Sequence, residues 1–187
     1  AYQALMAEVE QRLQLAGYHA ASAYSASPVH GGTSWFSIST VHTGVTIDRP
    51  QIYAALERVG ARVPSLTRFF REQGYVTHAL QPGSWDRSGL HRFELFHHEI
   101  PVDGDTIAYH GKRYGWGRIP DQYSLGLFRE RYFRPSARPR YAFYMCLSTH
   151  YPWDGVPAHV RDWHALARPD FEPSAADDSW PLPLAYE

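Results

Sequence analysis

A helix, a glycine and a strand follow one another directly in the middle of the chain, and this order constrains the fold most. Ser65 follows a proline and is typical of a helix start, and Gly74 is typical of a helix end. The apolar run over residues 75 to 80 then predicts a strand, which Pro82 ends. This order of helix, glycine and strand favours an α/β fold with mostly parallel strands.

The other elements are predicted from the same kinds of signal. Apolar spacing and start or stop residues predict helices over residues 2 to 15, 34 to 43, 50 to 59, 121 to 132 and, in short form, 160 to 166. Residues 141 to 147 read as the clearest buried strand, and residues 18 to 27 as a short strand or extended segment. Residues 84 to 118 are predicted to be a long loop, and residues 168 to 187 an irregular tail.

Length and composition predict one folded domain over residues 1 to 187. The content of 44% hydrophobic and 20% charged residues is typical of a globular protein. The formal net charge is −1, and the sequence has no block of like charges that would form a basic surface for nucleic acid. No nucleic-acid partner is therefore expected. The single cysteine, Cys146, rules out an internal disulfide, and its apolar neighbours predict a buried, inert thiol.

Residues 30 to 34, His-Gly-Gly-Thr-Ser, form a glycine turn directly before the helix predicted at 34 to 43. Glycine permits backbone angles that a Cβ would forbid, and the turn presents hydroxyl groups at the positive end of a helix. That position favours anion binding and lowers the free energy of an alkoxide. An ordinary helix cap explains the same residues, and Ser34 is the expected cap while Thr33 is the candidate nucleophile.

Two further groups of polar residues follow predicted strands. Trp85 and Arg87 come soon after the strand at 75 to 80, and His150 follows the strand at 141 to 147. Ligands of parallel sheets gather at the carboxyl ends of the strands, so both groups are candidates for a site. The adjacent His97 and His98 are not expected to bind one metal together, because neighbours on a strand point to opposite faces.

In this order the three groups resemble the sulfatase-like branch of the alkaline phosphatase superfamily, specifically the lipoteichoic acid synthase and phosphoethanolamine transferase relatives. These proteins have a Gly-x-Thr-Ser turn, matched here at residues 31 to 34, and a later strand that ends in Ser/Thr-x-His followed by an aromatic residue and Pro, matched at 148 to 152. The resemblance implies a three-layer α/β sandwich with a mostly parallel sheet, incomplete at both ends of this chain.

The resemblance also implies roles for individual residues. Thr33 would be the nucleophile and a ligand of a divalent metal, either Mn or Zn or else Mg or Ca, whose remaining ligands lie outside this chain. His150 would contact the transferring phosphate or its leaving group, and Trp85 and Arg87 would bind the substrate. The implied substrate is a phosphate or sulfate ester, free or linked to a lipid or glycan, and the implied location is extracytoplasmic, in the periplasm or at the cell surface, within a membrane-anchored protein with membrane helices of its own.

The chain also departs from the family pattern. Residues 33 to 37 lack the Pro and Arg of the Cys/Ser-x-Pro-x-Arg motif of sulfatases, which disfavours sulfate-ester hydrolysis. Neither an acidic residue at the end of an earlier strand nor a later Gly-Asp-His is found. The chain is then an internal portion of a longer enzyme, or a relative without the metal. The leading hypothesis is a phosphotransferase or phosphoester hydrolase. The alternative hypotheses are a sulfuric ester hydrolase and a non-catalytic anion- or glycan-binding module.

Overall fold

The structure is a computed structural model that describes residues 2–20, 25–84, 96–114, 119–148, 150 and 160–167. The chain divides into two compact units, Ala1–Ser27 with Trp180–Glu187 and Pro28–Ser179, and each is described by itself. The single domain over residues 1–187 stays a prediction. The predicted irregular tail, residues 168–187, lies outside the described residues.

The first unit contains the helix α1 (Tyr2–Leu15). The second unit contains, in chain order, α2 (Ser34–Thr43), α3 (Pro50–Val59), η1 (Gly60–Arg62), α4 (Leu66–Glu72), β1 (Val76–Gln81), β2 (Ile100–Asp103), α6 (Gly104–Ile107), α7 (Asp121–Arg131), β3 (Arg140–Tyr144) and η2 (Ala165–Ala167). The helices predicted at 2 to 15, 34 to 43 and 50 to 59 are confirmed, as is the one that opens at residue 121.

The three strands form one parallel sheet in the order β2-β1-β3. His78 of β1 lies opposite Ile100 on one side and Ala142 on the other, which sets the register. The α/β fold with a parallel sheet is therefore confirmed. The three-layer sandwich of the alkaline phosphatase superfamily stays a prediction.

The burial of the strands differs from the expectation. β1 is almost entirely buried, because it pairs on both edges and is covered on both faces. The stretch predicted at 141 to 147 as the clearest buried strand is shorter and only half-buried: β3 ends at Tyr144, and it pairs with β1 along one edge of the described sheet. Cys146 lies beyond its end and is exposed, so the prediction of a buried thiol is wrong. Partial desolvation nevertheless raises the pKa of this thiol.

The predicted loop at 84 to 118 contains two elements that the sequence did not indicate, β2 and α6. Residues 85–95 and 115–118 of that stretch lie outside the described residues. The strand or extended segment expected at 18 to 27 has no strand at residues 18–20 or 25–27, and residues 21–24 are likewise outside the described part.

One face of the sheet packs against α7. Leu80 of β1 and Val102 of β2 meet Leu127 and Phe128 of α7 in a buried apolar cluster. His78 lies on the same face, and its ring centroid is 5.7 Å from that of Phe128. These contacts join the sheet and α7 into one core.

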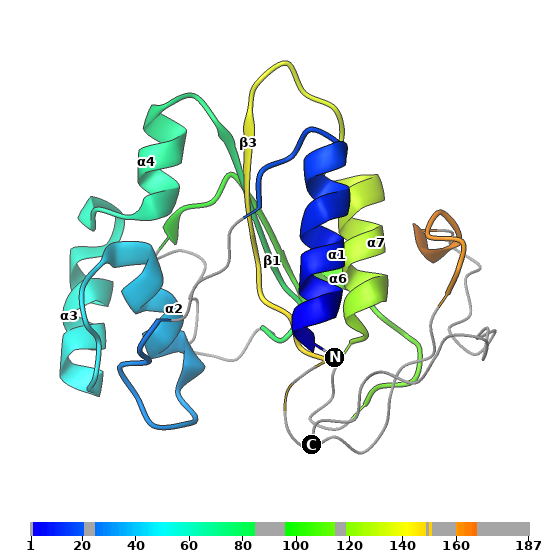
Figure 1. Ribbon diagram of the computed structural model, residues 1–187. Helices are drawn as coiled ribbons and strands as arrows, with labels where there is room; N and C mark the ends of the chain where they lie inside the picture. Colours follow the sequence, from blue (N-terminus) through cyan, green and yellow to red (C-terminus); the bar gives the residue numbers. More distant parts are fainter. Residues whose placement is uncertain are drawn as a thin grey trace. The chain divides into compact units, whose positions relative to one another are not determined.

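The opposite face meets α4 and α2. The ring of Phe70 in α4 stacks on Tyr141 of β3 with 4.3 Å between centroids, and the ring of His42 in α2 meets Phe143 edge-on at 4.6 Å. Figure 1 shows α2, α3 and α4 on one side of the strands and α7 on the other. A second buried cluster ties α2 to α3, with the members Phe36, Ile47, Tyr53, Val63 and Phe96.

Candidate active site

The glycine turn before α2 places three successive residues in the left-handed region. The φ angle is 76° at Gly31, 62° at Gly32 and 43° at Thr33. Glycine adopts such angles freely, whereas a β-branched residue there is an outlier that costs about 1–2 kcal/mol. Strain of this kind persists only where the surroundings impose it.

The first turn of α2 bonds to Thr33 directly. The backbone N–H of Phe36 donates to the carbonyl oxygen of Thr33 at 2.8 Å, and the ring of Phe36 is buried against Tyr53, with 5.5 Å between centroids. The buried ring anchors the helix start, and the hydrogen bond ties the turn to it. Thr33 itself is half-buried.

Thr33 occupies the N-cap position of α2, yet its side chain makes no capping hydrogen bond. A capping side chain bonds an N–H of the first turn from an extended backbone, and the left-handed backbone of Thr33, with φ 43° and ψ 38°, is not extended. The prediction that Ser34 is the cap is wrong, because Ser34 is the first helical residue. The Thr33 hydroxyl is therefore not used to cap the helix.

The electrostatic surroundings of this hydroxyl favour negative charge. The N-terminus of a helix carries a partial positive charge from its aligned peptide groups. The first turn of α2 contains no acidic residue to compensate that charge. An alkoxide or a phosphate oxygen at Thr33 would meet the start of a ten-residue helix whose first turn has no acidic residue.

His150 lies in a turn that follows β3, where its backbone N–H donates to the carbonyl oxygen of Leu147 at 2.9 Å. The carboxylate of Asp121 accepts from the backbone N–H groups of Leu147, at 2.7 Å, and Ser148, at 2.9 Å. In return the Ser148 hydroxyl accepts from the backbone N–H of Asp121 at 3.1 Å. Asp121 thus binds the turn after β3, and it holds the backbone at Leu147 and Ser148.

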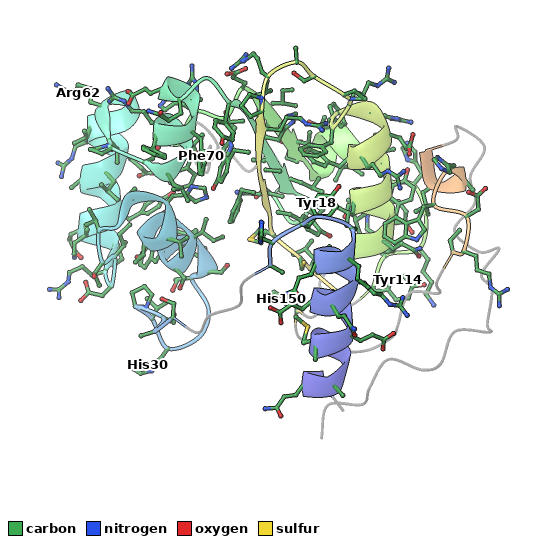
Figure 2. The ribbon with its side chains drawn as sticks, turned by 45° about the horizontal axis from the view of Figure 1, so that its top comes forward. Tyr18, His30, Arg62, Phe70, Tyr114 and His150 are labelled. Carbon is green, nitrogen blue, oxygen red and sulfur yellow. The ribbon has the colours of Figure 1, made fainter. Side chains whose placement is uncertain are left out.

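Trp85 and Arg87 lie outside the described residues, so their predicted role in binding substrate stays a prediction. Figure 2 shows His30, three residues before Thr33, well apart from His150. The structure thus presents the glycine turn and the turn after β3 as two separate places in the second unit. Their joint participation in one site also stays a prediction.

The described residues contain no group of three or more His, Cys, Asp or Glu side chains that could hold a metal ion. The residues present in the described part therefore do not by themselves fit the divalent metal that the family resemblance implies. Thr33 as a metal ligand, with Mn, Zn, Mg or Ca as the metal, stays a prediction.

Sequence reasoning missed a group of buried polar side chains under α2 and α4. His42 is 2% exposed, His98 is 8% exposed and Thr67 is fully buried, and the three contact one another. They are separated by 25 and 31 residues along the chain, so no local motif joins them. The one available signal was that His42 falls on the inner face of a helix whose other buried residues include Phe36.

Comparison with family models, with curated proteins and with solved structures found no match to this chain. Among the helices that the structure describes, none is both long enough and apolar enough to cross a membrane.

Proposed function

We propose that this chain carries the nucleophile of a phosphotransferase or phosphoester hydrolase that acts on a phosphate-containing head group through Thr33. The observation that carries the proposal is the state of Thr33: a strained, half-buried threonine at the positive end of a helix, whose hydroxyl is not used for capping. Backbone strain concentrates at functional sites, and a purely structural turn gains nothing from a β-branched residue at this φ.

The reaction would proceed in two displacements. The Thr33 oxygen attacks phosphorus, its proton passes to a base, and the bond from phosphorus to the leaving oxygen breaks as that oxygen takes up a proton. An alcohol, in transfer, or water, in hydrolysis, then attacks the phospho-threonine and releases the Thr33 oxygen, which is protonated again. The N-terminus of α2 would stabilise the negative charge that gathers on the phosphoryl oxygens.

The remaining parts of the proposal come from the sequence. His150 is the candidate donor of the proton to the leaving oxygen, and Arg87 and Trp85 would hold the phosphate and wall the pocket. Helices on both faces of a parallel sheet support the sandwich of the sulfatase-like branch. A divalent metal, an extracytoplasmic location and a membrane anchor belong to the same proposal, and the metal's other ligands would come from beyond the described residues.

The test uses the full-length protein with a chromogenic aryl phosphate and, in parallel, the matching aryl sulfate. Thr33→Ala should lower kcat/KM for the phosphate about a thousandfold or more, because it removes the nucleophile. Thr33→Ser keeps a hydroxyl and should retain part of the activity. Mass spectrometry of the quenched wild-type reaction should find a phosphoryl group on Thr33.

Ser34→Ala is the matched control, because it removes the neighbouring hydroxyl and should leave turnover nearly unchanged. Full activity of Thr33→Ala would overturn the mechanism. Preferred turnover of the aryl sulfate would favour the sulfuric ester hydrolase instead.

A second candidate, a non-catalytic anion- or glycan-binding module, is favoured by one observation: the first turn of α2, behind a glycine turn, has no acidic residue. Such an end binds anions through backbone N–H groups without any reaction. This function predicts that inorganic phosphate binds the wild type and Thr33→Ala equally well, and that neither turns over the ester.

A further inference from the structure

Two histidine rings and one threonine hydroxyl meet where α2 and α4 cover the sheet. The hydroxyl oxygen of Thr67 lies 3.4 Å from Nδ1 of His42 and 3.2 Å from Nε2 of His98. All three residues are buried, with exposed fractions of 2% for His42, 8% for His98 and 0% for Thr67. We call these three residues the histidine latch.

Aromatic side chains surround the histidine latch. The His42 ring stacks on Phe96 at 4.3 Å between centroids and meets Phe143 of β3 edge-on at 4.6 Å. The His98 ring lies parallel to the ring of Tyr141, also of β3, at 6.2 Å. The latch therefore connects α2, α4 and the segment before β2 to one face of the sheet.

The two hydrogen bonds of the latch suit a pair of neutral rings. One hydroxyl can donate to one ring nitrogen and accept from one ring N–H, which suits two neutral histidines of complementary tautomers. The other two ring nitrogens, Nε2 of His42 and Nδ1 of His98, are buried and have no hydrogen-bond partner among the described residues. Once both rings are protonated, each of these nitrogens is a charged N–H donor without an acceptor among the described residues.

Among the described residues, the charged and titratable groups near the latch do not compensate such a charge. Arg71 of α4 and His78 of β1 both act against protonation of His98, as does His42 itself. The ring of Tyr141 of β3 lies against His98, and burial raises the pKa of this tyrosine, so it stays neutral. Glu99 favours protonation of His78, not of the latch pair.

We propose that the histidine latch is an acid-sensitive switch, which holds α2 and α4 on the sheet while both rings are neutral and releases them when the rings take up protons. Release would free the C-terminal half of the helix whose N-terminus carries Thr33. The switch is a property of the fold and does not depend on the chemistry proposed for Thr33.

The direction of the pH dependence follows from burial. Desolvation lowers the pKa of His42 to about 4 and that of His98 to about 3, from an ordinary value of 6.5. The released state, with solvated rings, therefore binds more protons than the closed state below pH 6.5. The closed state loses stability as pH falls from 6.5 toward those lowered values, by about tenfold in the equilibrium constant per pH unit for each ring.

Hydrogen–deuterium exchange of the full chain at pH 7 and pH 5.5, corrected for intrinsic rates, tests the switch. Amides of α2 and α4 should lose at least about tenfold more protection than amides of α7, which packs on the other face of the sheet. The double variant His42→Phe/His98→Leu should abolish this difference. His110→Gln is the matched control, because His110 is exposed, and it should respond like the wild type.

Equal pH responses of α2, α4 and α7 would overturn the proposal. Should the double variant fail to fold, nuclear magnetic resonance of the wild-type imidazole protons decides the question. Rings of His42 and His98 that titrate near 6.5, while α2 and α4 stay protected, would equally overturn it. Activity toward phosphate esters is not measured, so the outcome is independent of the proposed function.

Discussion

Two helix starts in this chain carry the same kind of residue and use it differently. At α4 the backbone of Ser65 is extended, with φ −143° and ψ 156°, and its hydroxyl accepts from the N–H of Arg68 at 3.1 Å. At α2 the backbone of Thr33 is left-handed and its hydroxyl caps nothing. The difference teaches that the backbone before the helix, and not the hydroxyl residue, decides whether a cap forms.

The start of α7 extends the comparison. Its first residue, Asp121, directs its carboxylate to the turn after β3. The side chains at the starts of α4 and α7 thus form hydrogen bonds that stabilise the fold, whereas the side chain of Thr33 forms no capping hydrogen bond. Removing these side chains should affect stability most at α7, less at α4 and least at α2, and three substitutions test the comparison.

Asp121→Ala should have the largest effect on stability. It leaves the N–H groups of Leu147, which is buried, and of Ser148 without their acceptor, and bonds to a charged group are worth about 1.5–3 kcal/mol each. We expect the free energy of unfolding, measured by urea titration at pH 7, to fall by about 3 kcal/mol. Glu57→Ala on the exposed surface of α3 is the control and should change it by less than about 0.5 kcal/mol. If Asp121→Ala lowers the free energy of unfolding no more than the control does, the hydrogen bonds of this carboxylate do not stabilise the fold.

Ser65→Ala should have an intermediate effect. It removes the one side-chain cap at the start of α4, which is worth about 1 kcal/mol. The same urea titration measures the loss, and Ser65→Gly should lose only a few tenths of a kcal/mol, because glycine is tolerated at an N-cap. An unchanged free energy of unfolding in Ser65→Ala would show that the cap of α4 does not stabilise the protein, and the two helix starts would then not differ in this respect.

Thr33→Gly should have the smallest effect, and of the opposite sign. Glycine removes the strain at φ 43°, and the greater entropy of the unfolded chain offsets part of that gain. We expect the free energy of unfolding to rise by about 0.5 kcal/mol. A fall of 1 kcal/mol or more would show that the threonine side chain holds the turn, and would remove the main reason to regard it as functional.

Most helices of this chain could be predicted because their ends carry local signals. Gly44, for example, has a φ of 69°, and its N–H bonds the carbonyl oxygen of Thr40 at 2.8 Å, which ends α2 where the sequence indicated. The strand β2 was missed because it has only four residues and includes Pro101. Proline is tolerated in a sheet at an edge, and β2 is an edge strand of the described sheet.

The candidate site was less predictable than the fold. The position of Thr33 before a helix followed from the glycines, but its left-handed φ and its missing cap belong to the folded backbone, and no local residue pattern indicates them. The histidine latch joins residues far apart in sequence, so no spacing rule could find it. The exposure of Cys146 was missed because an apolar run shows where a strand can form and not where it ends.

The run of left-handed residues at 31 to 33 has a stereochemical consequence. Nothing lies within 4 Å of a Cβ built on Gly31 or Gly32, so space is not what excludes L side chains there. The exclusion comes from the handedness of the backbone alone, and positive φ is the angle that D-amino acids prefer. A D-amino acid would therefore fit the backbone of residues 31 to 33 with less strain than the L-threonine that occupies position 33.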